Sequence, residues 1–91
     1  MISTQYLSLN NILNSSLTLF PNPADNFIQI KYDYLMPDNY SIIDINGRLI
    51  DSRIIVSEND LLIDVRDFEK GLYFILLGSS KGINSLKFVI K

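Results

Sequence analysis

The sequence predicts an all-β domain, a seven-stranded antiparallel β-sandwich. Short apolar stretches recur at intervals of about 8–12 residues, and turn-forming residues separate them, which is typical of sandwiches. No stretch has the periodicity of an amphipathic helix. Of the 91 residues, 47% are apolar and 20% are charged, which suits a single folded domain.

Prolines and alternating polarity mark the first two strands. Leu17–Phe20 is apolar and ends at the segment Pro21–Pro23, because proline lacks a backbone donor and cannot continue a central strand. Ile28–Tyr32 alternates apolar and polar residues, which indicates a half-buried strand. Before them, residues 1–16 are uncharged and rich in Ser and Asn. We expect a linker or loosely docked arm there, and the domain itself over residues 17–91.

The dipeptide Asn46-Gly47 predicts a β-hairpin. It separates the strands expected over Tyr40–Ile45 and Arg48–Val56. Asn-Gly favours a type I′ turn, in which both central residues have positive φ. We therefore expect these two strands to pair directly.

Three further strands complete the pattern. They are expected over Leu61–Val65, Leu72–Leu77 and Asn84–Ile90, with a corner over residues 66–71 and a loop over residues 78–82. In the last strand, Phe88 and Ile90 share one face. Lys87, Val89 and Lys91 share the other.

The strand Leu72–Leu77 is apolar on both faces. The side chains expected in the core are Tyr73, Ile75 and Leu77, and those expected outside are Leu72, Phe74 and Leu76. Two interpretations of the outer side chains stay open. Either the N-terminal arm or long neighbouring side chains cover them, or they form a surface for a partner.

Missing residue types exclude several kinds of chemistry. Without Cys and His, the chain lacks disulfides, thiolate nucleophiles, the usual zinc ligands and the usual general base. A net charge of −2 and scattered basic residues argue against nucleic-acid binding. The longest apolar run is too short to span a bilayer, and the N-terminus does not resemble a secretory signal. We expect no catalytic residues, no metal site and no cofactor.

Acidic residues offer the remaining catalytic hypothesis. Asp64 with Asp67, or Asp44 with Asp51, would be candidate pairs for acid–base catalysis. Solvent-facing positions on strands and turns explain them better. A calcium site is weakly indicated, because no loop places oxygen ligands at alternate positions.

The C-terminal strand carries two lysines, Lys87 and Lys91, on one face. Lysines on an edge strand commonly prevent aggregation between sheet edges. The alternative is a recognition role, in which a partner pairs with the strand and binds the terminal carboxylate.

Blocks of residues in a fixed order resemble the type A C-terminal sorting domain of the type IX (Por) secretion system. The blocks are Leu17–Ala24, Tyr40–Ile50, Phe68–Ile75 and Leu86–Lys91. The matching motif positions are Pro21, Asn22 and Pro23, the hairpin glycine Gly47, the corner glycine Gly71, and the terminal basic residues Lys87 and Lys91. The resemblance covers Leu17 to Lys91.

The resemblance implies an Ig-like β-sandwich that is a signal and not an enzyme. Such a domain lies at the C-terminus of a larger cargo protein in a Gram-negative bacterium. It directs the cargo from the periplasm through the outer-membrane translocon, so that the cargo is secreted or displayed on the cell surface. A sortase-like surface peptidase usually removes the domain, and we expect the cleavage before Leu17. It requires no cofactor and no direct membrane insertion.

Translocon recognition is expected to involve strand addition or groove docking of the segment Asn84–Lys91. The recognition residues expected are Lys87, Phe88, Val89, Ile90 and Lys91. The alternative is an Ig-like adhesive or carbohydrate-binding module of a secreted protein. The absence of Trp and the strand positions of most of the five Tyr and five Phe make that alternative weaker.

Overall fold

The computed structural model describes residues 17–32, 37–56 and 60–91. The predicted arm over residues 1–16 lies outside this range. The described residues form seven strands: β1 (Leu17–Phe20), β2 (Phe27–Tyr32), β3 (Asn39–Asp44), β4 (Leu49–Ile54), β5 (Asp60–Asp64), β6 (Gly71–Ser79) and β7 (Gly82–Ile90). None of the described residues forms a helix that could cross a membrane.

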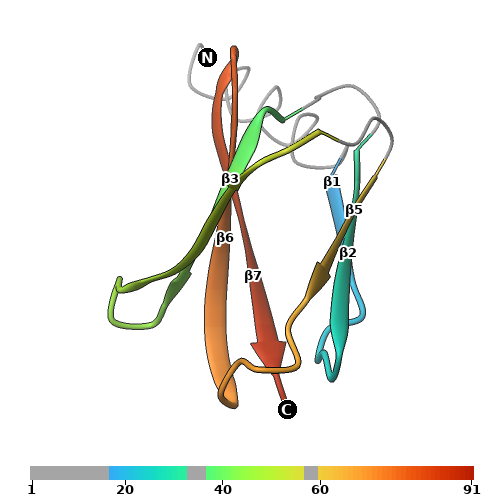
Figure 1. The fold of residues 1–91 in the computed structure, drawn as a ribbon, viewed down its shortest axis with the longest axis vertical. Coiled ribbons are helices and arrows are strands. Elements are labelled where there is room, and N and C mark those ends of the chain that lie inside the picture. The colour runs from blue at the N-terminus through green and yellow to red at the C-terminus, as the bar shows by residue number, and fades with distance from the viewer. Residues whose placement is uncertain (1–16, 33–36, 57–59) are drawn as a thin grey trace, which may run out of the picture.

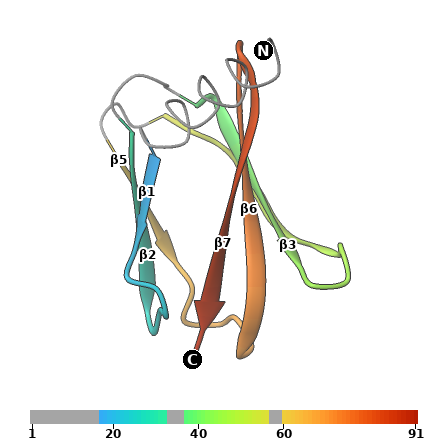
Figure 2. The same cartoon turned by 180° about the vertical axis from the view of Figure 1, so that it is seen from behind.

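The strands form two antiparallel sheets that face each other (Figures 1 and 2). One sheet has the order β1-β2-β5 and the other the order β4-β3-β6-β7. In the constant-type immunoglobulin fold the fourth strand joins the first sheet, whereas here β4 pairs with β3. The predicted seven-stranded antiparallel sandwich is confirmed.

The core contains alternate side chains from both sheets, as the period-2 pattern predicts. Ile28 and Ile30 of β2 face Ile42, Ile75 and Phe88 of the other sheet, and all five are 0% exposed. The aromatic rings of the core make further contacts at one end of the sandwich. The ring of Tyr73 stacks on Phe88 with centroids 5.6 Å apart and touches Phe68 at 5.3 Å.

The predicted hairpin between β3 and β4 is confirmed, but the prediction of a type I′ turn is wrong. Gly47 has a φ of +83°, whereas no described residue other than glycine has a positive φ. The Gly47 N–H donates to the carbonyl of Asp44, and the Asp44 N–H donates to the carbonyl of Arg48, each at 3.0 Å. This is a three-residue loop that ends in a left-handed glycine. The Asp44 carboxylate stabilises it by accepting the N–H groups of Asn46 and Arg48 at 2.9 Å each.

The loop predicted over residues 78–82 is wrong. Strands β6 and β7 continue into it, and pairing reaches Ser79 and Gly82, so only Ser80 and Lys81 turn the chain. The Gly and Ser residues of this segment suggested a loop, but both residue types can also adopt the extended backbone of a strand. Gly78 suits its position opposite Asn39 of β3, because the Cβ atom of any other residue would lie 2.7 Å from the Asn39 Oδ1.

The side chains of β6 that point into the core are the predicted ones. Those on the outer face are less exposed than predicted. Tyr73, Ile75 and Leu77 are 6%, 0% and 2% exposed and lie in the core. The outer side chains are half-buried; they are Leu72, Phe74 and Leu76. Their cross-strand neighbours on β7 are Val89, Lys87 and Ser85, and Ile43 of β3 lies opposite Phe74. Long neighbouring side chains therefore cover part of this face, which agrees with one of the two interpretations.

The burial of Phe88 predicts a strong dependence of folding on β7. Replacing Phe88 by Ala should lower the free energy of unfolding by about 3–5 kcal/mol, because it removes a large buried ring and leaves a cavity. The exposed residue Ile83 on the same strand is the control, and Ile83→Ala should change the free energy by less than about 0.5 kcal/mol. Urea denaturation of both variants checks this, and similar losses would contradict the assigned facing of β7.

Candidate functional site

The C-terminal strand β7 lies at the edge of the four-stranded sheet. Of the residues predicted for recognition, Lys87, Val89 and Lys91 are exposed. Phe88 and Ile90 are 0% and 4% exposed and belong to the core. In the folded domain, the side chains of these two residues therefore anchor the strand, and only the side chains of the other three are accessible from outside.

The Pro-Asn-Pro motif contacts β7 directly. We call residues 21–24, the first part of the connection between β1 and β2, the strap. The side-chain amide of Asn22 donates to the carbonyl of Lys87 at 3.3 Å, and its Oδ1 accepts the Val89 N–H at 3.0 Å. Asn22 thereby bonds to the outer edge of β7 as the backbone of a neighbouring strand would.

Backbone bonds of Ala24 continue this contact. The Ala24 N–H donates to the carbonyl of Val89 at 2.7 Å, and the Lys91 N–H donates to the carbonyl of Ala24 at 3.1 Å. Ala24 is 0% exposed, so the strap also closes the core at this point. Farther along the chain, the Lys91 ammonium lies 3.7 Å from the carboxylate of Asp25.

The strap changes the expectation of a free edge at the C-terminus. On the outer side of β7, the Lys87 carbonyl, both backbone groups of Val89 and the N–H of Lys91 are already bonded. Sequence reasoning noted the two prolines as a strand terminator and missed this contact. Asn22 and Val89 are separated by 67 positions, and no local pattern links residues so far apart.

Conformation explains both motif glycines. Gly47 has its positive φ in the β3–β4 loop, and Gly71 has a φ of +148° at the start of β6. Nothing lies within 4 Å of a Cβ atom built on either residue. The backbone angle therefore favours glycine at both positions, and crowding does not.

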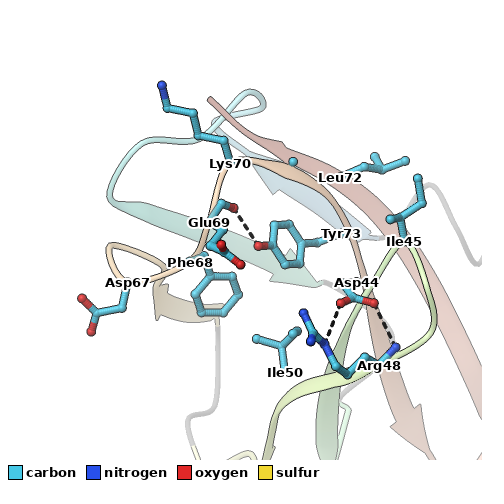
Figure 3. A pocket seen from close by; sticks show the side chains of 11 residues that line it. Asp44, Ile45, Arg48, Ile50, Asp67, Phe68, Glu69, Lys70, Leu72 and Tyr73 are labelled. Carbon is cyan, nitrogen blue, oxygen red and sulfur yellow. Dashed lines mark hydrogen bonds and ion pairs between the residues drawn. The ribbon is translucent and has the colours of Figure 1, made fainter.

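The two glycine turns flank a hollow of about 440 Å³ at one end of the sandwich (Figure 3). The Tyr73 hydroxyl at its wall donates to the carbonyl of Glu69 at 2.7 Å. On the opposite side, the Arg48 Nε donates to the Asp44 carboxylate at 3.0 Å. Burial raises the pKa of Tyr73, so its hydroxyl keeps its proton to a higher pH than an exposed tyrosine does. Figure 3 shows the bonds from Tyr73 to Glu69 and from Arg48 to Asp44, and these bonds stabilise the two turns.

Three of the four candidate catalytic carboxylates are paired with arginines. Asp44 pairs with Arg48, Asp51 with Arg53 and Asp64 with Arg66, at 3.0, 3.4 and 2.6 Å. Hydrogen bonds from the Arg66 side chain lower the pKa of Asp64 to about 2, and the bond from the Arg48 N–H lowers the pKa of Asp44. A general acid near neutral pH needs the opposite shift.

Metal ligands do not gather in the part of the chain that the structure describes. No cluster of three or more His, Cys, Asp or Glu residues occurs there.

Removing the Asn22 side chain should loosen the end of β7. For Asn22→Ala we expect a loss of about 1 kcal/mol in the free energy of unfolding, because the bonds to Lys87 and Val89 disappear. The Val89 amide should exchange with solvent faster, as measured by NMR. Asn22→Asp is the matched control, since it keeps the acceptor for Val89 and should protect that amide better than alanine does. Unchanged exchange in the alanine variant would contradict the contact.

The Asp64–Arg66 pair predicts a dependence of stability on acid. The pKa of Asp64 is about 2 in the folded domain, below the usual value of about 4 in an unfolded chain. Its contribution is therefore present above about pH 4 and is lost as the pH falls toward 2. An NMR titration of the carboxyl carbon should give a midpoint near 2, and Arg66→Gln should move it toward 4. Equal midpoints in the two proteins would contradict the pairing.

Comparisons with known proteins agree with this architecture. No curated protein matched the chain. The family described as the secretion system C-terminal sorting domain matches residues 18–91, which include the strap, both glycine turns and β7. Domains of this kind are C-terminal signals that direct an attached N-terminal cargo to the cell surface or out of a Gram-negative cell. The chain belongs to this family and is a C-terminal sorting domain of type IX secretion.

Proposed function

We propose that the domain presents the C-terminal end of β7 to the outer-membrane translocon and that Lys87 and Lys91 supply charge complementarity. The observation that carries this proposal is their common position. Both lysines are exposed on an edge strand whose intervening side chains, Phe88 and Ile90, are fixed in the core. Opposite charges across an interface accelerate encounter and exclude wrong partners.

The strap makes this end of β7 rigid before any partner binds. It bonds the backbone from Lys87 to Lys91 on the side that β6 leaves free. A pre-organised surface loses less conformational entropy on binding. The ion pair between Lys91 and Asp25 is long and exposed, so a partner's acidic group replaces it at little cost.

The fold separates this surface from the cargo. The strap and the C-terminus lie at the same end of the sandwich, whereas β1 begins toward the other end (Figures 1 and 2). An N-terminal cargo is therefore attached away from the lysines. This arrangement leaves the end of β7 accessible while a large protein is connected to the domain.

The same proposal includes the type A subclass, removal by a sortase-like surface peptidase and the absence of enzymatic activity. The matching motif positions support the subclass. Pairing of β1 with β2 begins at Leu17 with Tyr32, and a peptidase needs extended, accessible backbone, so cleavage belongs upstream of Leu17. The arginine-paired carboxylates Asp44, Asp51 and Asp64 support a role without catalysis.

The alternative of an adhesive or carbohydrate-binding module is not supported by the family match. Four of the eight aromatic side chains that the structure describes lie in the core and are not available for a sugar-binding platform. Tyr32, Tyr40, Tyr73 and Phe88 are each no more than 6% exposed.

Charge removal tests the proposed recognition surface. We expect the double variant Lys87→Gln/Lys91→Gln to reduce surface display at least tenfold, because the attraction to the translocon is lost. The chain is fused behind a secreted reporter in a bacterium with a type IX system, and reporter is measured on the surface and in the periplasm. Truncation is less informative, because removing residues 87–91 also removes Phe88 from the core.

The matched control is Lys70→Gln/Lys81→Gln, which removes two exposed lysines from other parts of the domain. It should be exported like the unchanged domain, and circular dichroism should show both double variants folded. Normal display of a folded Lys87→Gln/Lys91→Gln variant would overturn the proposal.

A further inference from the structure

The outer edge of β7 consists of two parts. The two-residue turn makes Ser79 and Gly82 a pair, and such a closing pair is hydrogen-bonded. Alternation along the antiparallel ladder then directs the backbone groups of Ile83, Ser85, Lys87 and Val89 away from β6. The strap bonds to Val89 from that side, which confirms the alternation independently.

The strap occupies only the C-terminal part of this edge. It begins at the carbonyl of Lys87. The N–H and carbonyl groups of Ile83 and Ser85, and the N–H of Lys87, point outward ahead of it, and no hydrogen bond from the described residues reaches them. Ile83 is 75% exposed, so side chains do not cover this part either.

We propose that an extended segment of the export machinery adds to β7 as a strand along Ile83–Lys87. This inference rests on the proposed function and assigns a separate role to each part of the strand. The backbone of residues 83–87 pairs with the partner. The strap occupies the outer backbone groups from the Lys87 carbonyl to the Lys91 N–H, so only side chains remain for the partner in that part.

Charge determines the chemistry of the added strand. Lys87 and Phe74 lie opposite each other on the outer face of the sheet, as do Ser85 and Leu76. A strand paired with β7 places side chains on the same face, so an acidic residue suits the position opposite Lys87 and an apolar residue the position opposite Ile83. A second copy of this chain, paired antiparallel about Ser85, would place Ile83 and not a carboxylate opposite each Lys87. The charge pattern therefore favours a different, acidic partner.

Proline at position 85 tests strand addition selectively. The Ser85 N–H points away from β6, so Ser85→Pro removes no bond of the β6–β7 ladder but blocks a partner. With the reporter fusion described above, we expect Ser85→Pro to reduce surface display at least tenfold. Ser85→Ala keeps the N–H and should be exported normally. Thermal unfolding of the purified variants measures whether both retain the fold.

Ile83→Pro, with Ile83→Ala as its control, provides a second position with an outward N–H. Normal export of either folded proline variant would overturn the inference. Unfolding of both would also overturn it, because an open sheet edge with outward N–H groups tolerates proline. The wild-type domain could instead form dimers that Ser85→Pro abolishes without reducing export. That result would assign the edge to a second copy of the chain.

The two proposals fail separately. If Lys87→Gln/Lys91→Gln blocks export and a folded Ser85→Pro variant does not, only strand addition is wrong. If Lys87→Gln/Lys91→Gln is exported normally, the proposed recognition by the lysines is wrong whatever the proline variants show.

Discussion

The contact between the strap and β7 connects the two ends of this small domain. Asn22 and Ala24 bond to the outer edge of the last strand, while β6 pairs with its inner edge. Beneath it, Phe88 and Ile90 fill the space between the sheets. The last residues of the chain are thus fixed on three sides, and the direction in which Lys87 and Lys91 point depends on all of these contacts.

This arrangement suits a signal that acts while joined to a much larger protein. A sorting domain of type IX secretion has to present the same surface whatever cargo precedes it. Here the surface is built from residues at both ends of the domain and is held by main-chain bonds and core packing. Its geometry therefore depends on the domain alone, and β1, the first strand, begins toward the opposite end of the sandwich (Figure 1).

Local chemistry made much of the fold predictable from the sequence. Alternation located Ile28 and Ile30 in the core, and Asn46-Gly47 located the hairpin. The turn type was wrong because the Asp44 carboxylate stabilises a longer loop. The strap could not be predicted, because the bond from Asn22 to Val89 depends on how the two sheets pack. The predicted recognition residues form the continuous run Lys87–Lys91, whereas the alternation of side chains along β7 places Phe88 in the core.

The position of Asn22's partners has a consequence for biosynthesis. Lys87, Val89 and Lys91 lie in or directly after β7, which follows the other six described strands along the chain, so neither the strap contact nor the Phe88 packing exists until β7 has been synthesised. A polypeptide that ends prematurely leaves Ala24 exposed and the four-stranded sheet without its edge strand. A sorting domain of this construction is therefore incomplete on any cargo protein whose synthesis stops before β7.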